Sequence, residues 1–252
     1  MSKLIDNSAI ETDDSRRFWN NWNAERRVGN WKMSPACERE AREVIQYVQG
    51  IGGNGKLNIL EVGCGSGWLC SELAAFGQVT GTDIANEVLG KSAAENPRIT
   101  FIAGDFLDLA LPANHFDVVV SVEVLSHVTD QPAFMAKIGH VLRAGGHLVL
   151  ATQNRIVLSR WSNVVPQAPG QIRKWVDAKT LRKMLARHFE IVEFKSVVPV
   201  GDRGFLRLVN SYKVNKILSF FVSQQRLDAL KETLFLGHSL IAFARKPIDQ
   251  RA

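Results

Sequence analysis

Residues 57–67 read LNILEVGCGSG, a short apolar run that ends in three glycines spaced two residues apart. Leu57 to Val62 have the length and apolar character of a buried strand, and Trp68 opens a segment whose apolar residues recur at helical spacing. A glycine turn between a strand and a helix lets a ligand approach the backbone, and the helix start offers free N–H groups. The stretch therefore predicts a ligand-binding turn in an α/β fold.

Beyond this turn, short apolar runs alternate with longer segments of helical period, which is typical of a doubly wound parallel sheet. Asp130 is predicted to cap the helix that follows it, and Gly145-Gly146 to end that helix and turn into the next strand. The predicted strands are 57–62, 78–83, 99–103, 116–124, 147–152, 190–198 and 238–244.

Asp83 follows Gly63 by twenty residues and ends the next predicted strand, where a carboxylate can accept hydrogen bonds from the hydroxyls of a ribose. Two adenosine-bearing cofactors use this arrangement. NAD enzymes carry GxGxxG, whereas here the third glycine comes one residue earlier and Trp68 stands in its place. Glu61 would repel a pyrophosphate but suits a cationic ligand. These residues favour S-adenosylmethionine over NAD.

From Asn58 to Asn154 the chain resembles the class I S-adenosylmethionine-dependent methyltransferases. EVGCGSG at 61–67 is similar to the family's first motif, and Asp83 to its ribose-binding acid. FDVVVSVEVLSHV at 116–128 resembles the fourth strand and its loop, and LRAGGHLVLAT at 142–152 resembles the fifth strand. The resemblance implies the family's Rossmann-like α/β fold, a doubly wound sheet of seven mostly parallel strands with an antiparallel last strand.

The same resemblance implies S-adenosylmethionine as the cofactor and S-adenosylhomocysteine as its product. In Gly104-Asp105-Phe106, Asp105 would accept a hydrogen bond from the adenine amino group, and Phe106 would lie beside the ring. Because the methyl group on a positive sulfur is already activated, such a protein mainly aligns the acceptor and excludes water. The expected cofactor-binding residues are Glu61, Gly63, Cys64, Gly65, Gly67, Asp83, Ile84, Gly104, Asp105, Phe106 and Val122.

The loop after the fourth strand bears on the acceptor. DNA-adenine and protein-glutamine methyltransferases of this fold carry Asn/Asp-Pro-Pro-Tyr/Phe where residues 121–124 read SVEV, which argues against those substrates. EVLSHV (123–128), ATQNR (151–155) and KWVDAKTL (174–181) instead resemble ubiquinone-biosynthesis O-methyltransferases. That subgroup typically carries a second acid before the histidine, where this chain has Ser126, so no metal site is expected.

We therefore expect methyl transfer to an oxygen of a small molecule. The alternatives are methylation of RNA or protein with the help of the basic C-terminal half, or N-methylation of a small metabolite. His127 is the candidate catalytic base, because a neutral imidazole can take a proton from a hydroxyl during methylation. A contact with the cofactor, or a cap on a backbone group, is the alternative role of His127.

Charge is unevenly distributed along the chain. Residues 1–125 hold 11 basic and 17 acidic residues, whereas residues 126–252 hold 20 basic and 8 acidic ones. Ligands of open α/β sheets sit beyond the carboxyl ends of the strands, so the segment after the fifth strand is expected near the pocket. Arg155, Arg160 and Arg173 are candidates for holding a carboxylate or phosphate of the acceptor.

Two segments flank the predicted sheet. Residues 1–50 are predicted to form an N-terminal helical cap, in which Trp19 and Trp22 are candidate substrate contacts. Residues 51–252 form the methyltransferase domain, with a helical insertion at about 205–233. The apolar residues between 217 and 230 predict either a lid or a surface that touches a lipophilic substrate or a membrane interface.

The whole composition, 252 residues with a net charge of +6 and 46% apolar residues, is that of a globular protein. Residues 1–15 contain four acids and no apolar run, which excludes a secretory or transit signal there, and no apolar stretch has the length of a membrane span. Three cysteines are too few for a disulfide framework, so a cytoplasmic location is expected. The expected partner is a small, anionic or lipophilic acceptor rather than a nucleic acid.

Overall fold

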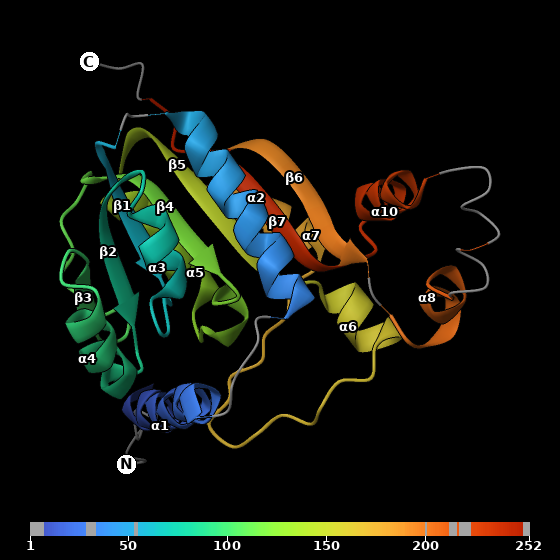
Figure 1. Cartoon of the computed structure of the whole chain (residues 1–252), viewed down its shortest axis with the longest axis horizontal. Coiled ribbons are helices and arrows are strands. Elements are labelled where there is room, and N and C mark those ends of the chain that lie inside the picture. Colours follow the sequence, from blue (N-terminus) through green and yellow to red (C-terminus); the bar gives the residue numbers. More distant parts are fainter. Residues whose placement is uncertain are drawn as a thin grey trace, which may run out of the picture.

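A seven-stranded sheet forms the centre of the molecule (Figure 1). The computed structural model describes residues 8–28, 34–52, 55–199, 201–211, 216 and 223–248. The strand order is β3-β2-β1-β4-β5-β7-β6, in which β7 runs antiparallel to β5 and β6 while the other pairs are parallel. The Rossmann-like doubly wound fold expected from the sequence is confirmed.

Every predicted strand is present, with ends that differ by a few residues. The strands are β1 (Leu57–Val62), β2 (Gly77–Asp83), β3 (Thr100–Ala103), β4 (Phe116–Val122), β5 (Leu142–Gln153), β6 (Glu190–Pro199) and β7 (Gly237–Arg245). The helices described are α1 (Ser8–Val28), α2 (Pro35–Ile51), α3 (Trp68–Leu73), α4 (Asn86–Glu95), α5 (Gln131–Val141), α6 (Arg155–Trp161), α7 (Ala178–Leu185), α8 (Gly204–Val209) and α10 (Gln224–Thr233), with a 3-10 turn at Leu125–His127.

The main difference from the predicted elements lies at Gly145-Gly146. Asp130 does cap α5, accepting a hydrogen bond from the Ala133 N–H at 2.9 Å, but the helix ends at Val141 and β5 begins immediately. The two glycines lie inside β5 because the chain just past β7 pairs with them: Gly145 N donates to the Lys246 carbonyl, and Lys246 N donates to that of Gly146. Antiparallel pairing thus extends β5 backwards over the predicted turn.

Apolar side chains form one core on each face of the sheet. On one face α5 and α7 bury residues such as Phe134 and Leu181. On the other, α2 and α3 bury residues such as Val44, Val48 and Leu73, none of which is exposed. Helix α2 therefore shares a core with the sheet. The boundary predicted at residue 50, between an N-terminal helical cap and the methyltransferase domain, stays a prediction.

Helix α1 lies beyond the carboxyl ends of the parallel strands (Figure 1) and is anchored there by Asn20. The Asn20 amide donates to the side chain of Asn86 at 3.0 Å and accepts from the N–H of Glu87 at 3.3 Å. Helix α4 has no side-chain cap of its own, so Asn20 satisfies one of its free N–H groups from a distant part of the chain.

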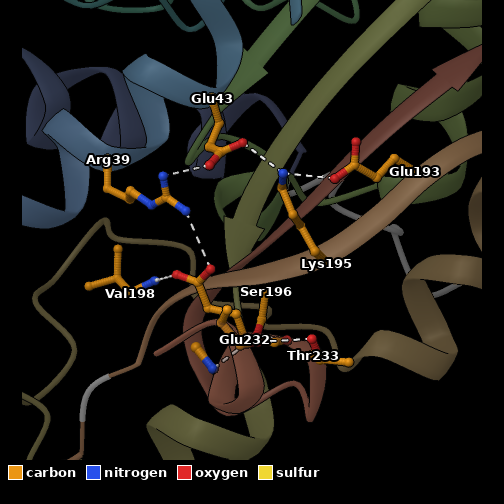
Figure 2. Close-up of polar contacts among 10 residues, drawn as sticks. Arg39, Glu43, Glu193, Lys195, Ser196, Val198, Glu232 and Thr233 are labelled. Atoms are coloured by element: carbon orange, nitrogen blue, oxygen red, sulfur yellow. Dashed lines mark hydrogen bonds and ion pairs between the residues drawn. The ribbon is translucent and has the colours of Figure 1, made fainter. Parts of the chain in front are cut away.

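The late insertion contains α8 and α10, while residues 217–222 lie outside the described part of the chain. Ion pairs join α2 to α10 and to β6, and a hydrogen bond joins α10 to β6 (Figure 2). Glu232 accepts from Arg39 and from the Val198 N–H, both at 3.3 Å, and Glu43 pairs with Arg39 and Lys195, both at 2.7 Å. Among the described residues, no helix is both long and apolar enough to cross a bilayer.

Replacing Asn20 by alanine should lower the free energy of unfolding by about 1 kcal/mol, the typical value of a lost helix cap. Thermal or urea unfolding measures the change. Asn21→Ala is the matched control, since Asn21 is exposed on the next position of α1. Equal stability of the two variants would contradict an anchoring role for Asn20.

Candidate cofactor and acceptor site

A large cavity of about 1020 Å³ opens at the carboxyl ends of β1, β2 and β4. Helix α1 and the segment from Val164 to Trp175 contribute side chains to its wall. Helix α1 and this segment also contact each other: a Cβ on Gly170 would lie only 2.6 Å from the backbone oxygen of Asp14. The site is therefore closed over by parts of the chain outside the sheet.

The glycine turn after β1 requires glycine at each of its three positions. Gly63, Gly65 and Gly67 have φ values of +75°, +52° and +74°, which other residues rarely adopt. A Cβ on Gly63 would also lie 2.1 Å from Cγ2 of Val124 in the loop after β4. The turn is held to β2 by the N–H of Gly63, which donates to the Thr82 carbonyl at 2.7 Å.

Asp83 at the end of β2 fixes this turn from the other side. Its carboxylate accepts from the Gly65 N–H at 2.7 Å and from the Ala85 N–H at 2.8 Å. Burial raises the pKa of Asp83, and these two backbone hydrogen bonds oppose the increase. A carboxylate has about four acceptor positions, so it can still accept hydrogen bonds from two ligand hydroxyls.

Glu61 provides a direct test of whether a cationic cofactor fits. It is 4% exposed, lines the cavity, and its Oε2 has no hydrogen-bond partner among the described residues. Burial raises the pKa of Glu61 to about 8. A buried carboxyl group with one unsatisfied oxygen is stabilised in its charged form when a cationic group is bound beside it. The glycine turn, Asp83 and Glu61 together fit S-adenosylmethionine.

The loop after β3 brings Gly104, Asp105 and Phe106 to the same cavity. Gly104 N donates to the Asp83 carbonyl at 2.9 Å, and Asp105 accepts from the Leu107 N–H at 2.9 Å. Phe106 is 7% exposed and packs edge-on against Phe134 at 5.2 Å, so it belongs to the core as well as to the cavity wall. Adenine contacts for Asp105 and Phe106 stay a prediction.

His127 lies in the 3-10 turn after β4, and one of its ring nitrogens forms a hydrogen bond to the backbone. Its Nδ1 lies 2.6 Å from the carbonyl oxygen of Ile172, which can only accept, so Nδ1 carries the proton and Nε2 is an acceptor. Burial lowers the pKa of His127, and nearby Arg173 lowers it further. The edge of the ring packs against Trp19 at 4.8 Å. His127 is thus a neutral imidazole under the covering helix.

The predicted substrate residues divide into two groups. Trp19, Trp22 and Arg173 line the cavity. The guanidinium of Arg173 donates to the Val165 carbonyl and to the Gln171 side chain, both at 2.8 Å, and so holds the covering segment together. Arg155 and Arg160 are exposed on α6, outside the cavity wall, and Arg155 pairs with Asp177.

Sequence reasoning missed Glu123, Gln153, Trp175 and His238, which also line the cavity. Glu123 has a φ of +60°, which is unusual for a residue other than glycine, and strain of this kind gathers at functional sites. The position of Glu123 directly after β4 was the sequence signal that could have identified it.

In the part of the chain that the structure describes, no three His, Cys, Asp or Glu side chains gather as a metal site.

Comparison with known proteins gives the family. The profile of the family described as Methyltransferase domain matches residues 60–150. A ubiquinone biosynthesis O-methyltransferase of Azorhizobium caulinodans is 31% identical over 180 residues, which cover 64% of this chain and 70% of that protein. This chain belongs to the class I S-adenosylmethionine-dependent methyltransferases. S-adenosylmethionine is therefore the cofactor that the glycine turn, Asp83 and Glu61 fit.

Further relatives agree with this methyltransferase family. A ubiquinone biosynthesis O-methyltransferase of Mesorhizobium japonicum is 36% identical over 167 residues, 58% of this chain and 66% of that protein. The chain spans between 42% and 70% of the lengths of the first three such relatives.

Solved structures share the fold of the methyltransferase. One is an N-methyltransferase of Bradyrhizobium japonicum in complex with S-adenosyl-L-homocysteine, with a TM-score of 0.62 and 19% identity, covering 93% of this chain and 99% of that one. Another is an S-adenosylmethionine-dependent methyltransferase of Mesorhizobium loti, with a TM-score of 0.60 and 21% identity, covering 82% and 98%.

Replacing Asp83 by alanine should weaken the binding of S-adenosylhomocysteine by roughly 1.5–3 kcal/mol, the range for hydrogen bonds to a charged group. Calorimetric titration measures the dissociation constant. Glu72→Ala is a suitable control, because Glu72 is an exposed acid on α3, outside the cavity wall. An unchanged dissociation constant for the Asp83 variant would remove Asp83 from the cofactor site.

Proposed function

We propose that this methyltransferase transfers the methyl group to an oxygen atom of a small, partly apolar molecule. The observation that carries the proposal is His127, whose Nε2 is a free acceptor in a cavity wall shared with Trp19, Trp22 and Trp175. A neutral imidazole can accept the proton of a hydroxyl group, and indole rings suit an apolar or aromatic acceptor.

Two further observations support a small acceptor. The volume of about 1020 Å³ lies at the upper end of the range for small-molecule sites, which leaves room for a second ligand beside the cofactor. The curated relatives from Azorhizobium and Mesorhizobium are named O-methyltransferases, which favours oxygen as the methylated atom.

Each group of residues has a task in this reaction. S-adenosylmethionine supplies an activated methyl group when bound. The glycine turn, Asp83 and Glu61 hold the cofactor, while α1 and the segment from Val164 to Trp175 exclude water. His127 takes the proton from the acceptor hydroxyl, with its tautomer fixed by the carbonyl of Ile172. Alignment of the reacting groups can supply about 7–11 kcal/mol of the catalytic effect.

The direct test is methyl transfer from labelled S-adenosylmethionine to matched pairs of acceptors that differ only in the receiving atom, such as phenols and the corresponding anilines. The proposal expects label in the phenols and far less in the anilines. Total cellular RNA and an unfractionated protein extract complete the panel. Label confined to the anilines, the RNA or the protein would overturn the choice of an oxygen on a small molecule.

Changing His127 to glutamine should lower kcat by about 10²–10⁴-fold, the usual contribution of a general base. Because burial lowers the pKa of His127, wild-type kcat should fall only at pH values below the ordinary histidine range, and the variant should lack this fall. A pH profile of kcat for both proteins is the measurement, with the dissociation constant of S-adenosylhomocysteine as the folding control. Full activity of the variant would assign deprotonation to another group.

A further inference from the structure

The wall of the cavity has a second polar region beside β4, β5 and β7, away from the cofactor residues on β1, β2 and β3. Glu123, Gln153 and His238 line the cavity there. In the strand order, β1 separates β4, β5 and β7 from β2 and β3, which carry the predicted ribose and adenine positions. This region is therefore on the acceptor side of the site.

Glu40 of α2 stands behind Glu123 and is 1% exposed. One oxygen of its carboxyl group accepts from the hydroxyl of Ser239, a fully buried residue of β7. The other oxygen, Oε2, has no partner among the described residues, and neither has Oε1 of Glu123. Two acidic side chains thus each have one unsatisfied oxygen, and the charge of Glu40 raises the pKa of Glu123.

These two acids have few hydrogen-bond donors. Ser239 has one hydroxyl proton, and it donates this proton to Glu40. Burial raises the pKa of Glu40 to about 7, and raises that of Glu123 well above its ordinary value, although the side chains of Ser239 and Gln153 oppose the increase at Glu123.

Basic groups do not neutralise the pair. Arg39, the neighbour of Glu40 on α2, turns instead to Glu43 and Glu232 (Figure 2). From β7, His238 Nδ1 lies 3.0 Å from the Ser239 oxygen, and burial lowers the pKa of His238, so that its ring is neutral. From β5, Gln153 is an uncharged amide. In the described part of the chain, no lysine or arginine forms an ion pair with either acid, so the negative charge that a carboxylate carries here is not neutralised by a basic side chain.

We propose that Glu40, Glu123 and Ser239 form a subsite of the acceptor pocket that binds an N–H or O–H donor, an ammonium or a hydroxyl group, and rejects a carboxylate. Glu123 contacts the ligand, while Glu40 is a positioning residue that acts through Ser239 and Glu123. The inference takes from the proposed function only that the second ligand of the cavity is a small molecule. It narrows the expected acceptor, because an anionic group at this end of the molecule is excluded.

The test measures binding of three probes of the same shape, benzylamine, benzyl alcohol and benzoate, to the full-length protein saturated with S-adenosylhomocysteine at pH 7. The wild-type protein should bind benzylamine, benzyl alcohol or both at least about tenfold more tightly than benzoate, as expected for one charge-assisted hydrogen bond. The two donor probes distinguish an ammonium from a hydroxyl preference. Binding is read by calorimetry or by ligand-observed NMR.

Glu123→Gln and Glu40→Gln should each reduce the preference for the donor probes over benzoate about fivefold or more, since an amide carries no charge. Both should bind S-adenosylhomocysteine as the wild type does. Glu43→Gln is the matched control: it lies one turn further along α2 and is buried, but its carboxylate is paired with Arg39 and Lys195. Its probe preference should equal that of the wild type.

Two results would overturn the proposal: benzoate binding as tightly as the donor probes, or a Glu43 variant that changes the preference as much as the Glu40 variant. If Glu40→Gln does not fold, Ser239→Ala replaces it, because it removes the shared hydroxyl and leaves both acids. The readout is binding and not methyl transfer. The methyl-transfer experiment can therefore contradict oxygen methylation while the binding experiment supports the subsite. In the same way, the binding experiment can contradict the subsite while oxygen methylation is supported.

Discussion

The contact between Gly63 and Val124 holds the two loops of the site against each other. A Cβ at position 63 would lie 2.1 Å from the Val124 side chain, so the loops can meet only where one of them has no side chain. Strands β1 and β4 are parallel neighbours, with Ile59 beside Val118, and deliver both loops to one edge of the sheet. The glycine turn and the loop that carries Glu123 and His127 therefore meet at one close contact between the Gly63 backbone and the Val124 side chain.

The sequence predicted the positions of the glycine turn and of Asp83 well, because the signals for both are local. The glycine turn and Asp83 belong to one strand–turn–helix–strand unit, in which spacing along the chain determines position in space. The acceptor side depends on contacts that spacing does not encode. Glu40 and Ser239 are 199 residues apart and meet only because α2 and β7 pack in the same core. His127 is an intermediate case. Its position after the fourth strand can be predicted from the local sequence, but its hydrogen-bond partner Ile172 lies 45 residues further along the chain and cannot.

The basic C-terminal half shows how a charge count can mislead about function. Lys195 pairs with Glu43 and Glu193, Arg182 lies over the rings of Phe194 and Phe235, and Arg173 holds the covering segment. Much of the positive charge thus links elements of the fold to one another. Glu40, by contrast, entered the sequence analysis only as part of the net charge, although it is buried beside Ser239 with one oxygen unpartnered among the described residues.

Helix α2 contacts both the late insertion and strand β7. Arg39 pairs with Glu232 of α10 (Figure 2), while Glu40, the next residue, accepts a hydrogen bond from Ser239 of β7. A substitution in α10 that breaks the Glu232–Arg39 pair therefore acts on the helix that carries Glu40, and not on β1 or β2, which carry the glycine turn and Asp83. Under the subsite proposed above, α10 is the region to vary in directed evolution of the acceptor preference.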